Sequence, residues 1–345
     1  MYRSFTSSSK IRGWKRVWRD LLSVALLIVV AELILRIGPI QAFLAEKLDP
    51  YENLLWYDRT LPAYEEQLRH HPDYTIWLLG SSPMMTGLNP AIIQENLRQA
   101  GYEGITVQNY GFTTMLNLGV MAQVVDRWLL ELDQPQYIIL GVAQANFTTT
   151  GADRNRIEDS PLENLMIYPD NIDDYVARFL YTNSVLFHYS ILAHNATIIP
   201  VERTRPDPLP LGGYTERSGT INCQQYLNFT RNGQIASVDL EGGLDRMDQL
   251  LDVIQARNIP VLVVNIPIAR CLLDDRFRAV DYYRTAYLEP LADHLHQRGI
   301  PFFDIDAAFY ELPAKDQNGF FDNGIHPNTD GADFMSSLLG HFLSG

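Results

Sequence analysis

Two short polar motifs near opposite ends of the chain contain residues that could carry out acyl transfer. Ser81 and Ser82 follow an apolar run that ends at Gly80. His326 stands in a Gly-Ile-His-Pro-Asn turn, directly before a predicted C-terminal helix. A serine nucleophile early in the chain and a histidine base late in it is one of the orders in which a Ser-His-acid site is assembled. The two motifs therefore predict a serine-dependent site.

The residue that would orient His326 is less clear. The position three residues before the histidine holds Asn323 rather than an acid. Asn323 could hold the imidazole by a hydrogen bond, but an Asp→Asn change in this role costs a serine protease about 10⁴-fold in kcat. Asp322 is one residue further from the histidine and ranks first among the candidate acids. Asp304 and Asp306 could approach from a neighbouring strand end.

The elements that must position these residues are predicted by apolar runs alternating with helical patterns. We expect strands at residues 75–79, 105–110, 137–142, 260–265 and 301–305, and helices at residues 90–99, 116–132, 242–257, 280–298 and 329–342. This alternation predicts an α/β fold with three α/β/α layers and a five-stranded parallel sheet. Chemistry in such sheets is placed at the carboxyl ends of the strands, where Gly80, Gly111 and Gly141 fall.

The regular alternation is interrupted at about residues 151–240. This stretch has Asp-rich turns and a proline cluster, and it predicts an insertion that could cover the active-site edge of the sheet. Residues 45–73 are a polar connector. The α/β domain is therefore expected at residues 74–345.

The residues at the N-terminus predict how the chain is oriented relative to a membrane. Six basic side chains and no acid occur in the first 19 residues, before an apolar segment. The pattern predicts a cytoplasmic tail at residues 1–20 and a transmembrane anchor at residues 21–44, with the α/β domain outside the cytoplasm. Glu32 and Arg36 are four residues apart and can pair on one helix face. A cleaved signal peptide is the alternative.

Composition excludes some classes of function. The net charge of −14 argues against nucleic-acid binding, which needs clustered Lys and Arg. The two cysteines, Cys223 and Cys271, could form one disulfide or remain thiols, and metal-ligand spacing is absent. We expect neither a metal nor a cofactor.

Together, the motifs resemble those of the SGNH (GDSL-type) hydrolase superfamily over roughly residues 74–343. The family places its nucleophile in Gly-Asp-Ser at the end of the first strand, and Gly80-Ser81-Ser82 matches that block, so the resemblance implies Ser82 as nucleophile. Asn109-Tyr110-Gly111 matches the block whose glycine N–H helps to hold the oxyanion. Asn323-Gly324-Ile325-His326 matches the Asp-x-x-His block in its histidine but not in its acid.

The third family block departs further. It normally reads Gly-x-Asn-Asp, with the asparagine as an oxyanion donor, but this chain has Gly141-Val142-Ala143-Gln144. The resemblance therefore implies an oxyanion hole formed by Ser82 and Gly111, with Gln144 or Asn146 as candidates for the remaining donor. Loss of one such donor costs about 10²–10³-fold in kcat.

The resemblance implies acyl transfer through an acyl-serine. Membrane-anchored members are similar to accessory acyltransferases that work beside a multispanning acyl-donor protein and modify a cell-envelope polysaccharide. A plain esterase or lipase, which passes the acyl group to water, is the nearest alternative. A degenerate SGNH domain acting as a carbohydrate-binding or scaffold protein is another, because the acid is missing.

Overall fold

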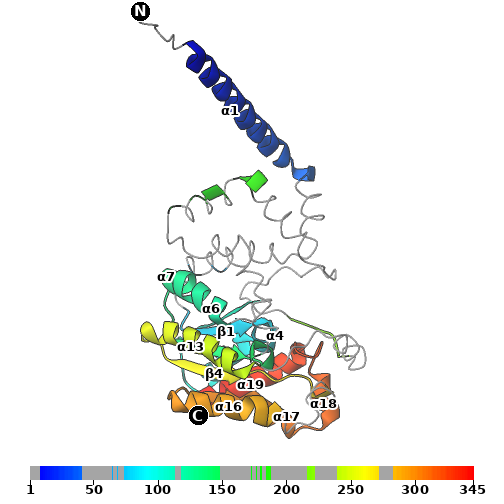
Figure 1. Cartoon of the computed structure of the whole chain (residues 1–345). Coiled ribbons are helices and arrows are strands. Elements are labelled where there is room, and N and C mark those ends of the chain that lie inside the picture. Colours follow the sequence, from blue (N-terminus) through cyan, green and yellow to red (C-terminus); the bar gives the residue numbers. More distant parts are fainter. Residues whose placement is uncertain are drawn as a thin grey trace, which may run out of the picture. The chain divides into compact units, whose positions relative to one another are not determined.

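The computed structural model describes residues 8–40, 74–112, 118–147, 184–187, 216–221, 239–271 and 283–345, together with Tyr64, Leu68, Ile172, Val176, Phe179 and Leu180. The chain divides into two compact units (Figure 1). One unit comprises Met1–Leu55 and Ser160–Pro206, and the other comprises Trp56–Asp159 and Asp207–Gly345. All the candidate site residues belong to the second unit.

The second unit contains the predicted sheet. Its strands are β1 (Ile76–Ser81), β2 (Val107–Phe112), β3 (Tyr137–Val142), β4 (Val261–Asn265) and β5 (Phe302–Asp304). They are ordered β2-β1-β3-β4-β5, and every neighbouring pair is parallel. This confirms the α/β fold with a five-stranded parallel sheet. The chain leaves β1 toward β2 on one side and continues to β3 on the other, and this switch point is where open parallel sheets bind their ligands.

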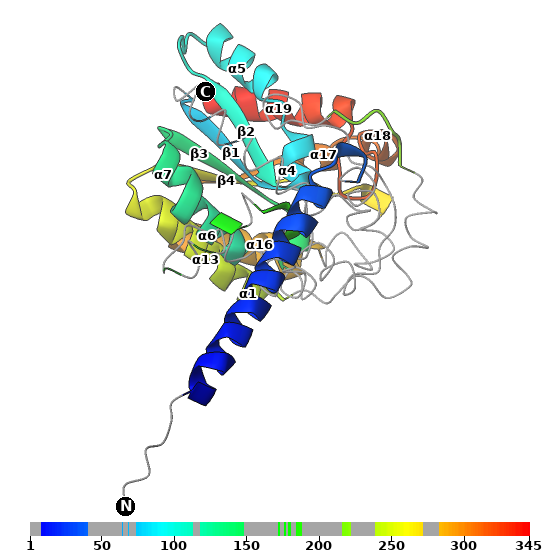
Figure 2. The same cartoon turned by 90° about the horizontal axis from the view of Figure 1, so that it is seen from above.

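Helices cover both faces of the sheet. They are α4 (Ser82–Gly87), α5 (Pro90–Gln99), α6 (Leu118–Val124), α7 (Leu130–Leu132), α13 (Leu240–Ala256), α16 (Glu289–Gln297), α17 (Ile305–Tyr310), α18 (Ala314–Gly319) and α19 (Thr329–Ser344). Two π-helical segments, Val125–Leu129 and Arg284–Leu288, join α6 to α7 and lead into α16. Figure 2 shows α5 and α19 on one face and α6, α13 and α16 on the other.

Local sequence explains the helices that hold the site. Asn89 caps α5 by accepting a hydrogen bond from the N–H of Ala91, and Pro90 occupies the first turn. Asn328 caps α19 by accepting one from Gly331. Both helices then bury an apolar stripe against the sheet, including Ile93, Leu97, Met335 and Leu339 over Leu78, Ile139 and Leu262. Each such side chain contributes about 1.5–3 kcal/mol on full burial.

The N-terminal helix α1 (Ser8–Leu35) corrects one prediction. Within the described residues, no helix is both long enough and apolar enough to span a bilayer, so the transmembrane anchor at residues 21–44 is not supported. The physical reason is the spacing of charges. Asp20 and Glu32 leave 11 uninterrupted apolar or small residues between them, about 16 Å of helix, against a hydrocarbon core about 30 Å thick.

Glu32 joins α1 to a short helical segment of the same unit. Its carboxylate accepts a hydrogen bond from Arg36, so the expected pair forms. It also accepts bonds from the hydroxyl of Ser184 at 2.9 Å and from the N–H groups of Val185 and Leu186 at 2.8 and 2.9 Å. Residues 184–186 lie within the predicted insertion, so part of that stretch is held by the N-terminal helix.

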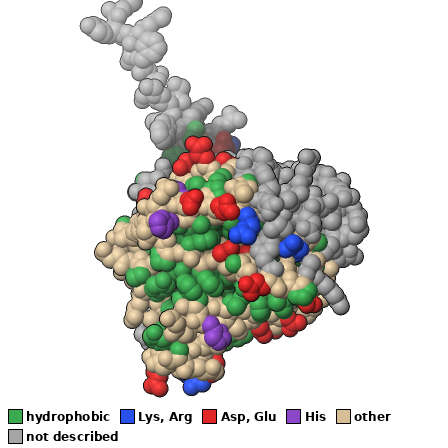
Figure 3. All heavy atoms as spheres, turned by 90° about the horizontal axis from the view of Figure 1, so that it is seen from below, with side chains coloured by type: hydrophobic (Ala, Val, Ile, Leu, Met, Phe, Trp, Pro, Cys, Tyr) green, Lys and Arg blue, Asp and Glu red, His purple; other side chains and the backbone are tan. Residues whose placement is uncertain are grey.

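The described surface reflects the acidic composition. On the face drawn in Figure 3, acidic side chains are scattered and Lys and Arg occur at only a few places. The described part of this face therefore carries no cluster of Lys and Arg of the kind that neutralises phosphates.

Cys271 is disulfide-bonded. The only other cysteine in the sequence is Cys223, which lies outside the described residues. Of the two alternatives that the sequence left open, the structure therefore favours one disulfide.

Candidate active site

Ser82 is positioned by a close approach of β1, β3 and α4. Gly80 is the residue that permits it, because a Cβ there would lie 2.5 Å from the carbonyl oxygen of Gly141 and 2.7 Å from the Cβ of Met84. β1 therefore ends at Ser81 and the chain turns directly into α4, whose first residue is Ser82. The Ser82 side chain is consequently held at the carboxyl edge of the sheet, with 9% of the residue exposed.

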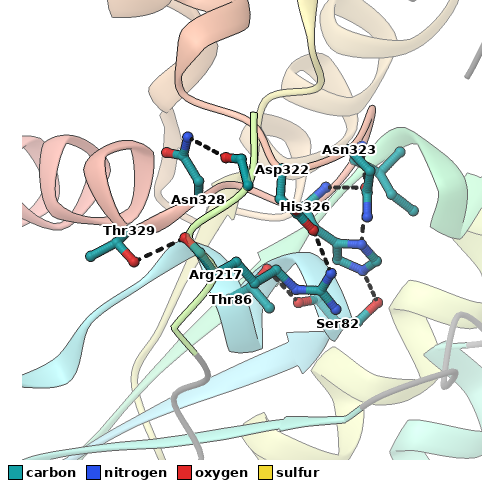
Figure 4. A network of polar contacts seen from close by, with 10 residues as sticks. Ser82, Thr86, Arg217, Asp322, Asn323, His326, Asn328 and Thr329 are labelled. Carbon is teal, nitrogen blue, oxygen red and sulfur yellow. Dashed lines mark hydrogen bonds and ion pairs between the residues drawn. The ribbon is translucent and has the colours of Figure 1, made fainter. Parts of the chain in front are cut away.

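His326 is delivered to this serine by a closed turn. Phe321 and Pro327 form an antiparallel bridge, and the N–H of Asp322 donates to the carbonyl oxygen of His326 at 3.0 Å. The Nε2 atom of His326 lies 2.8 Å from the Oγ atom of Ser82 (Figure 4). The structure thus brings together the two residues that the sequence paired across 244 positions.

The side chain that contacts Nδ1 of His326 is Asn323, at 3.0 Å (Figure 4). The same Oδ1 atom accepts hydrogen bonds from the backbone N–H groups of Ile325 and His326, at 3.2 and 3.0 Å. Backbone N–H groups only donate, so this atom is the amide oxygen and Nδ1 must carry the proton that faces it. Nε2 is then unprotonated and can accept the Ser82 hydroxyl proton.

Asp322, which ranked first as the acid, does not contact the imidazole. Its backbone N–H closes the turn with His326, and its carboxylate instead accepts a hydrogen bond from Arg217 Nη1 at 2.8 Å (Figure 4). The structure thus places Asn323, and not Asp322, beside Nδ1 of His326. Because the three-residue spacing to the histidine lets a side-chain oxygen reach two backbone N–H groups and Nδ1 together, position 323 takes the orienting role.

The other two acids that were considered belong to a different cluster. Asp304 accepts hydrogen bonds from the amide of Asn265 at 2.9 Å and from the N–H of Asp306 at 3.1 Å. Asn265 accepts in turn from the hydroxyl of Tyr287 at 3.0 Å. This buried network ties the end of β4 to the start of α17, and burial raises the pKa of Asp304.

Arg217 was not identified from the sequence. It lies in residues 216–221, a described segment within the predicted insertion, where no motif marks it. We call residues 216–221 the strap, because they run along the turn that carries His326. The N–H of Thr329 donates to the carbonyl oxygen of Arg217 at 2.7 Å, and that of Ile221 donates to Phe321 at 2.7 Å.

Gly219 brings the strap into closer contact with the turn. Its carbonyl oxygen accepts a hydrogen bond from the amide of Asn328 at 3.0 Å, and a Cβ at this position would overlap the Asp322 carboxylate.

The electrostatics around His326 favour the neutral imidazole. Burial, followed by the positive charge of Arg217, lowers the pKa of His326 to about 3, below its ordinary value of about 6.5. At neutral pH the imidazole is therefore an unprotonated base. Glu216 and Asp330 on the neighbouring elements are exposed to solvent, and Asp333 on α19 contacts Asn89.

Substitution of the two members of the Arg217–Asp322 pair should shift the pH dependence of Ser82 labelling in opposite directions. Only the neutral imidazole can accept the Ser82 proton, so the rate of labelling at Ser82 should fall as pH drops through the pKa of His326. Arg217→Gln removes a cation and leaves the Asp322 carboxylate without its partner, and both changes should raise the pKa of His326. The acid limb of the profile, which is the pH range where labelling falls with decreasing pH, should therefore move upward by about one pH unit. Asp322→Asn leaves Arg217 unpaired and should move the limb downward.

The measurement is the rate of covalent labelling by a fluorophosphonate as a function of pH. The double variant Arg217→Gln/Asp322→Asn should return the limb close to its wild-type position. Shifts of the two single variants in the same direction would show that the pair acts only through the fold of the turn.

Gly111, predicted as an oxyanion donor, has its N–H engaged within β2 in this structure. Its N–H donates to Oδ1 of Asn109 at 2.8 Å, so it is engaged within β2 instead of facing an oxyanion. The Asn109 amide in turn donates to the carbonyl oxygens of Met84 and Leu88, at 3.2 and 2.9 Å. A Cβ at Gly111 would lie 2.7 Å from the backbone of Met85. Gly111 therefore allows α4 to pack on β2.

Gln144 is the described side chain that best fits a donor role. It begins the 3-10 helix Gln144–Phe147 that follows β3, and only 6% of the residue is exposed. Its Nε2 atom is buried and has no hydrogen-bond partner in the described part of the protein. Asn146, the alternate, uses Oδ1 to accept from the N–H of Ala143 at 2.8 Å. Because β1 and β3 are neighbours, Gln144 and Ser82 both follow strand ends at the switch point.

Among the described residues, no group of three or more His, Cys, Asp or Glu side chains is arranged to hold a metal ion. The donors that the site offers are a serine hydroxyl, an imidazole and amide N–H groups. This set is suited to acyl transfer.

Comparison with known proteins adds no family assignment. The sequence matches no family model and no curated protein.

Proposed function

We propose that the α/β domain is an SGNH-like enzyme that transfers or hydrolyses an O-acyl group through an acyl-serine intermediate. The observation that carries this proposal is the 2.8 Å contact between Ser82 Oγ and His326 Nε2. The contact lies beyond the carboxyl end of β1, beside the switch point of the sheet, where α/β folds place ligands. The tautomer set by Asn323 leaves Nε2 able to accept the serine proton.

In the proposed mechanism, His326 takes the proton of Ser82 as the serine oxygen attacks the acyl carbon. The backbone N–H of Ser82, which has no intrahelical acceptor at the first position of α4, and the buried amide of Gln144 would stabilise the oxyanion. As the bond between the acyl carbon and the donor oxygen breaks, His326 gives this proton to the departing oxygen, which leaves an acyl-serine and a neutral imidazole. A hydroxyl acceptor, or water, then gives its proton to His326 and attacks the acyl group. His326 returns that proton to the Ser82 oxygen as it leaves.

For the acceptor we propose a cell-envelope polysaccharide or a similar carbohydrate hydroxyl, with the acyl group supplied by a multispanning membrane protein. The resemblance in the sequence motifs supports this choice. The disulfide at Cys271 supports an extracytoplasmic location, because disulfides persist in oxidising compartments.

A catalytically inactive SGNH domain that binds carbohydrate is the second candidate. The neutral Asn323 at the position of the family acid favours it.

The test is covalent labelling of the purified full-length chain with a fluorophosphonate probe, followed by peptide mass spectrometry. We expect labelling at Ser82, and Ser82→Ala should abolish it because the attacking oxygen is removed. Ser81→Ala is the matched control, since Ser81 is the adjacent buried serine and makes no side-chain capping bond. Absence of labelling in a folded wild-type chain would reject the enzymatic function in favour of the carbohydrate-binding one.

A further inference from the structure

We infer that the disulfide at Cys271 positions His326, so that the site becomes fully active only once this bond has formed. The inference rests on the proposed acyl-serine function and concerns its dependence on the redox state of the chain. Cys271 is disulfide-bonded and Cys223 is the only other cysteine in the sequence, so these two residues are paired. The bond therefore joins the segment after β4 to the strap, whose last residue, Ile221, precedes Cys223 by two positions.

The strap contacts the turn that carries His326 on both sides of this histidine. Before the histidine, the N–H of Ile221 donates to the carbonyl oxygen of Phe321 at 2.7 Å, and Arg217 binds the carboxylate of Asp322 at 2.8 Å. After the histidine, carbonyl oxygens of the strap accept hydrogen bonds from the start of α19, at Asn328 and Thr329. The strap itself forms no helix or strand, so these contacts hold it in place.

The segment on the other side of the disulfide contacts the same turn. The N–H of Ala269 donates to the carbonyl oxygen of Gly324 at 2.9 Å. The N–H of Cys271 donates to Oδ1 of Asn318, in α18, at 3.1 Å. Cys271 and Ile221 also pack against the same hydrophobic core. The turn is thus contacted by two segments, and the disulfide joins one segment to the other.

The strap should depend on the disulfide because its own contacts are individually weak. A hydrogen bond within the protein replaces one with water, and a partly exposed ion pair contributes little. The side chains of Arg217 and Asp322 are 31% and 27% exposed. A disulfide restricts the released chain and so favours the ordered one. Without the bond, we expect the strap to leave the turn while the sheet and its covering helices stay folded.

Release of the strap would raise the pKa of His326. The charge of Arg217 lowers this pKa to about 3, and the Asp322 carboxylate would lose its partner. Both changes move the pKa toward its ordinary value of about 6.5. The other described charged side chains on the surrounding elements are Glu216, Arg270, Asp316, Asp330 and Asp333. Of these, only Glu216 would move with the strap, and it is exposed to solvent.

The bond forms by thiol–disulfide exchange with a carrier protein that itself holds a disulfide. The thiolate of one cysteine attacks the carrier disulfide, and the second cysteine then attacks the mixed disulfide and releases the carrier as a dithiol. Two electrons and two protons pass from the cysteines to the carrier. Such carriers act in oxidising compartments. The site would therefore be completed only after the chain has reached one of them.

The experiment measures fluorophosphonate labelling of Ser82 in the full-length chain as a function of pH, before and after reduction by a phosphine without denaturant. The phosphine takes oxygen from water as the disulfide becomes two thiols, which are counted by alkylation and intact mass spectrometry. We expect the ratio of labelling at about pH 5 to labelling at about pH 8 to fall at least about tenfold, because a pKa near 6 leaves about a tenth of the imidazole neutral at the lower pH. Oxidised glutathione should restore the ratio, and the far-ultraviolet circular dichroism should not change.

The double variant Cys223→Ser/Cys271→Ser is the matched control, because it cannot form the bond and contains no other thiol. Its pH profile should equal that of the reduced wild type and should not respond to the phosphine. Arg217→Gln tests whether the effect runs through the strap. Reduction should move its acid limb by less than that of the wild type, because one of the contacts that reduction releases is already absent.

The outcomes separate the two proposals. Unchanged labelling and an unchanged acid limb after reduction to two thiols would overturn the inference while leaving the acyl-serine function intact. Equal shifts in the wild type and Arg217→Gln would also overturn it. So would loss of the circular dichroism signal on reduction, since the bond would then hold the whole fold and not the strap. If the oxidised chain is not labelled at Ser82, the proposed function fails, and the inference fails with it.

Discussion

Replacing His326 with alanine should reduce the rate of Ser82 acylation by about 10⁴–10⁶-fold, comparable to the loss of the catalytic histidine in a serine protease. The reason is the 2.8 Å contact between Nε2 and Ser82 Oγ, which is the only described contact of this hydroxyl with a base. Without the imidazole the serine remains protonated and is a weak nucleophile at neutral pH. The measurement is the second-order rate constant for fluorophosphonate labelling, since the probe reports on the activated serine directly.

His341→Ala is the control for this experiment. His341 lies on the exposed side of α19, where its ring contacts the carbonyl oxygen of Ser337 four residues earlier. Its loss should leave the labelling rate within about twofold of wild type, because exposed positions tolerate substitution. A His326→Ala variant that is folded and still labelled at a near wild-type rate would show that another group activates Ser82.

The second large effect is expected at Gly111. An alanine Cβ there would lie 2.7 Å from the N, Cα and Cβ atoms of Met85, and backbone atoms cannot rotate away as the tip of a side chain could. Overpacking in a core costs about 1–3 kcal/mol, and a backbone clash places Gly111→Ala at or above the upper end of that range. Since α4 must move to relieve the clash, Ser82 should also shift from His326 and the labelling rate should fall.

Urea unfolding of Gly111→Ala, followed by circular dichroism, measures the loss of stability as a lower midpoint at constant slope. Gly319→Ala is the comparison, because the space around that glycine holds no atom within 4 Å of the new Cβ. If Gly111→Ala unfolds at the wild-type midpoint, the packing of α4 on β2 does not require a glycine at this position.

Sequence periodicity predicted the sheet well because buried parallel strands are continuous apolar runs bounded by glycine or polar turns. β3 begins and ends where expected, at Tyr137 and Val142, and α5 begins after its predicted cap. The short helices α4, α17 and α18 were not predicted. Each has six residues, which is too few for a periodic pattern to emerge.

Site residues could be predicted from the sequence where the residue type and its local motif fit few roles other than a catalytic one. The serine after a strand-end glycine and the histidine in a polar turn were identified, and the structure places them in contact. For the partner of His326 the sequence offered Asn323 only as an alternate, because a ranking by charge favoured Asp322, whereas backbone geometry places Asn323 beside the ring. Arg217 could not be found, since its importance depends on a contact with a residue 105 positions away.

The residues that contact one another at this site lie far apart in the sequence. This separation has a consequence for the order in which the protein folds. Contacts between distant parts of a chain generally form late, because loop closure must precede them. Ser82, the strap and the turn around His326 come from three separate parts of the chain, and Cys271 adds an oxidation step. A nascent chain whose first three strands have already paired would therefore still carry an inert serine. The proposed acylating activity would arise only once the last helix, α19, had docked, so that partly folded molecules could not acylate other molecules around them.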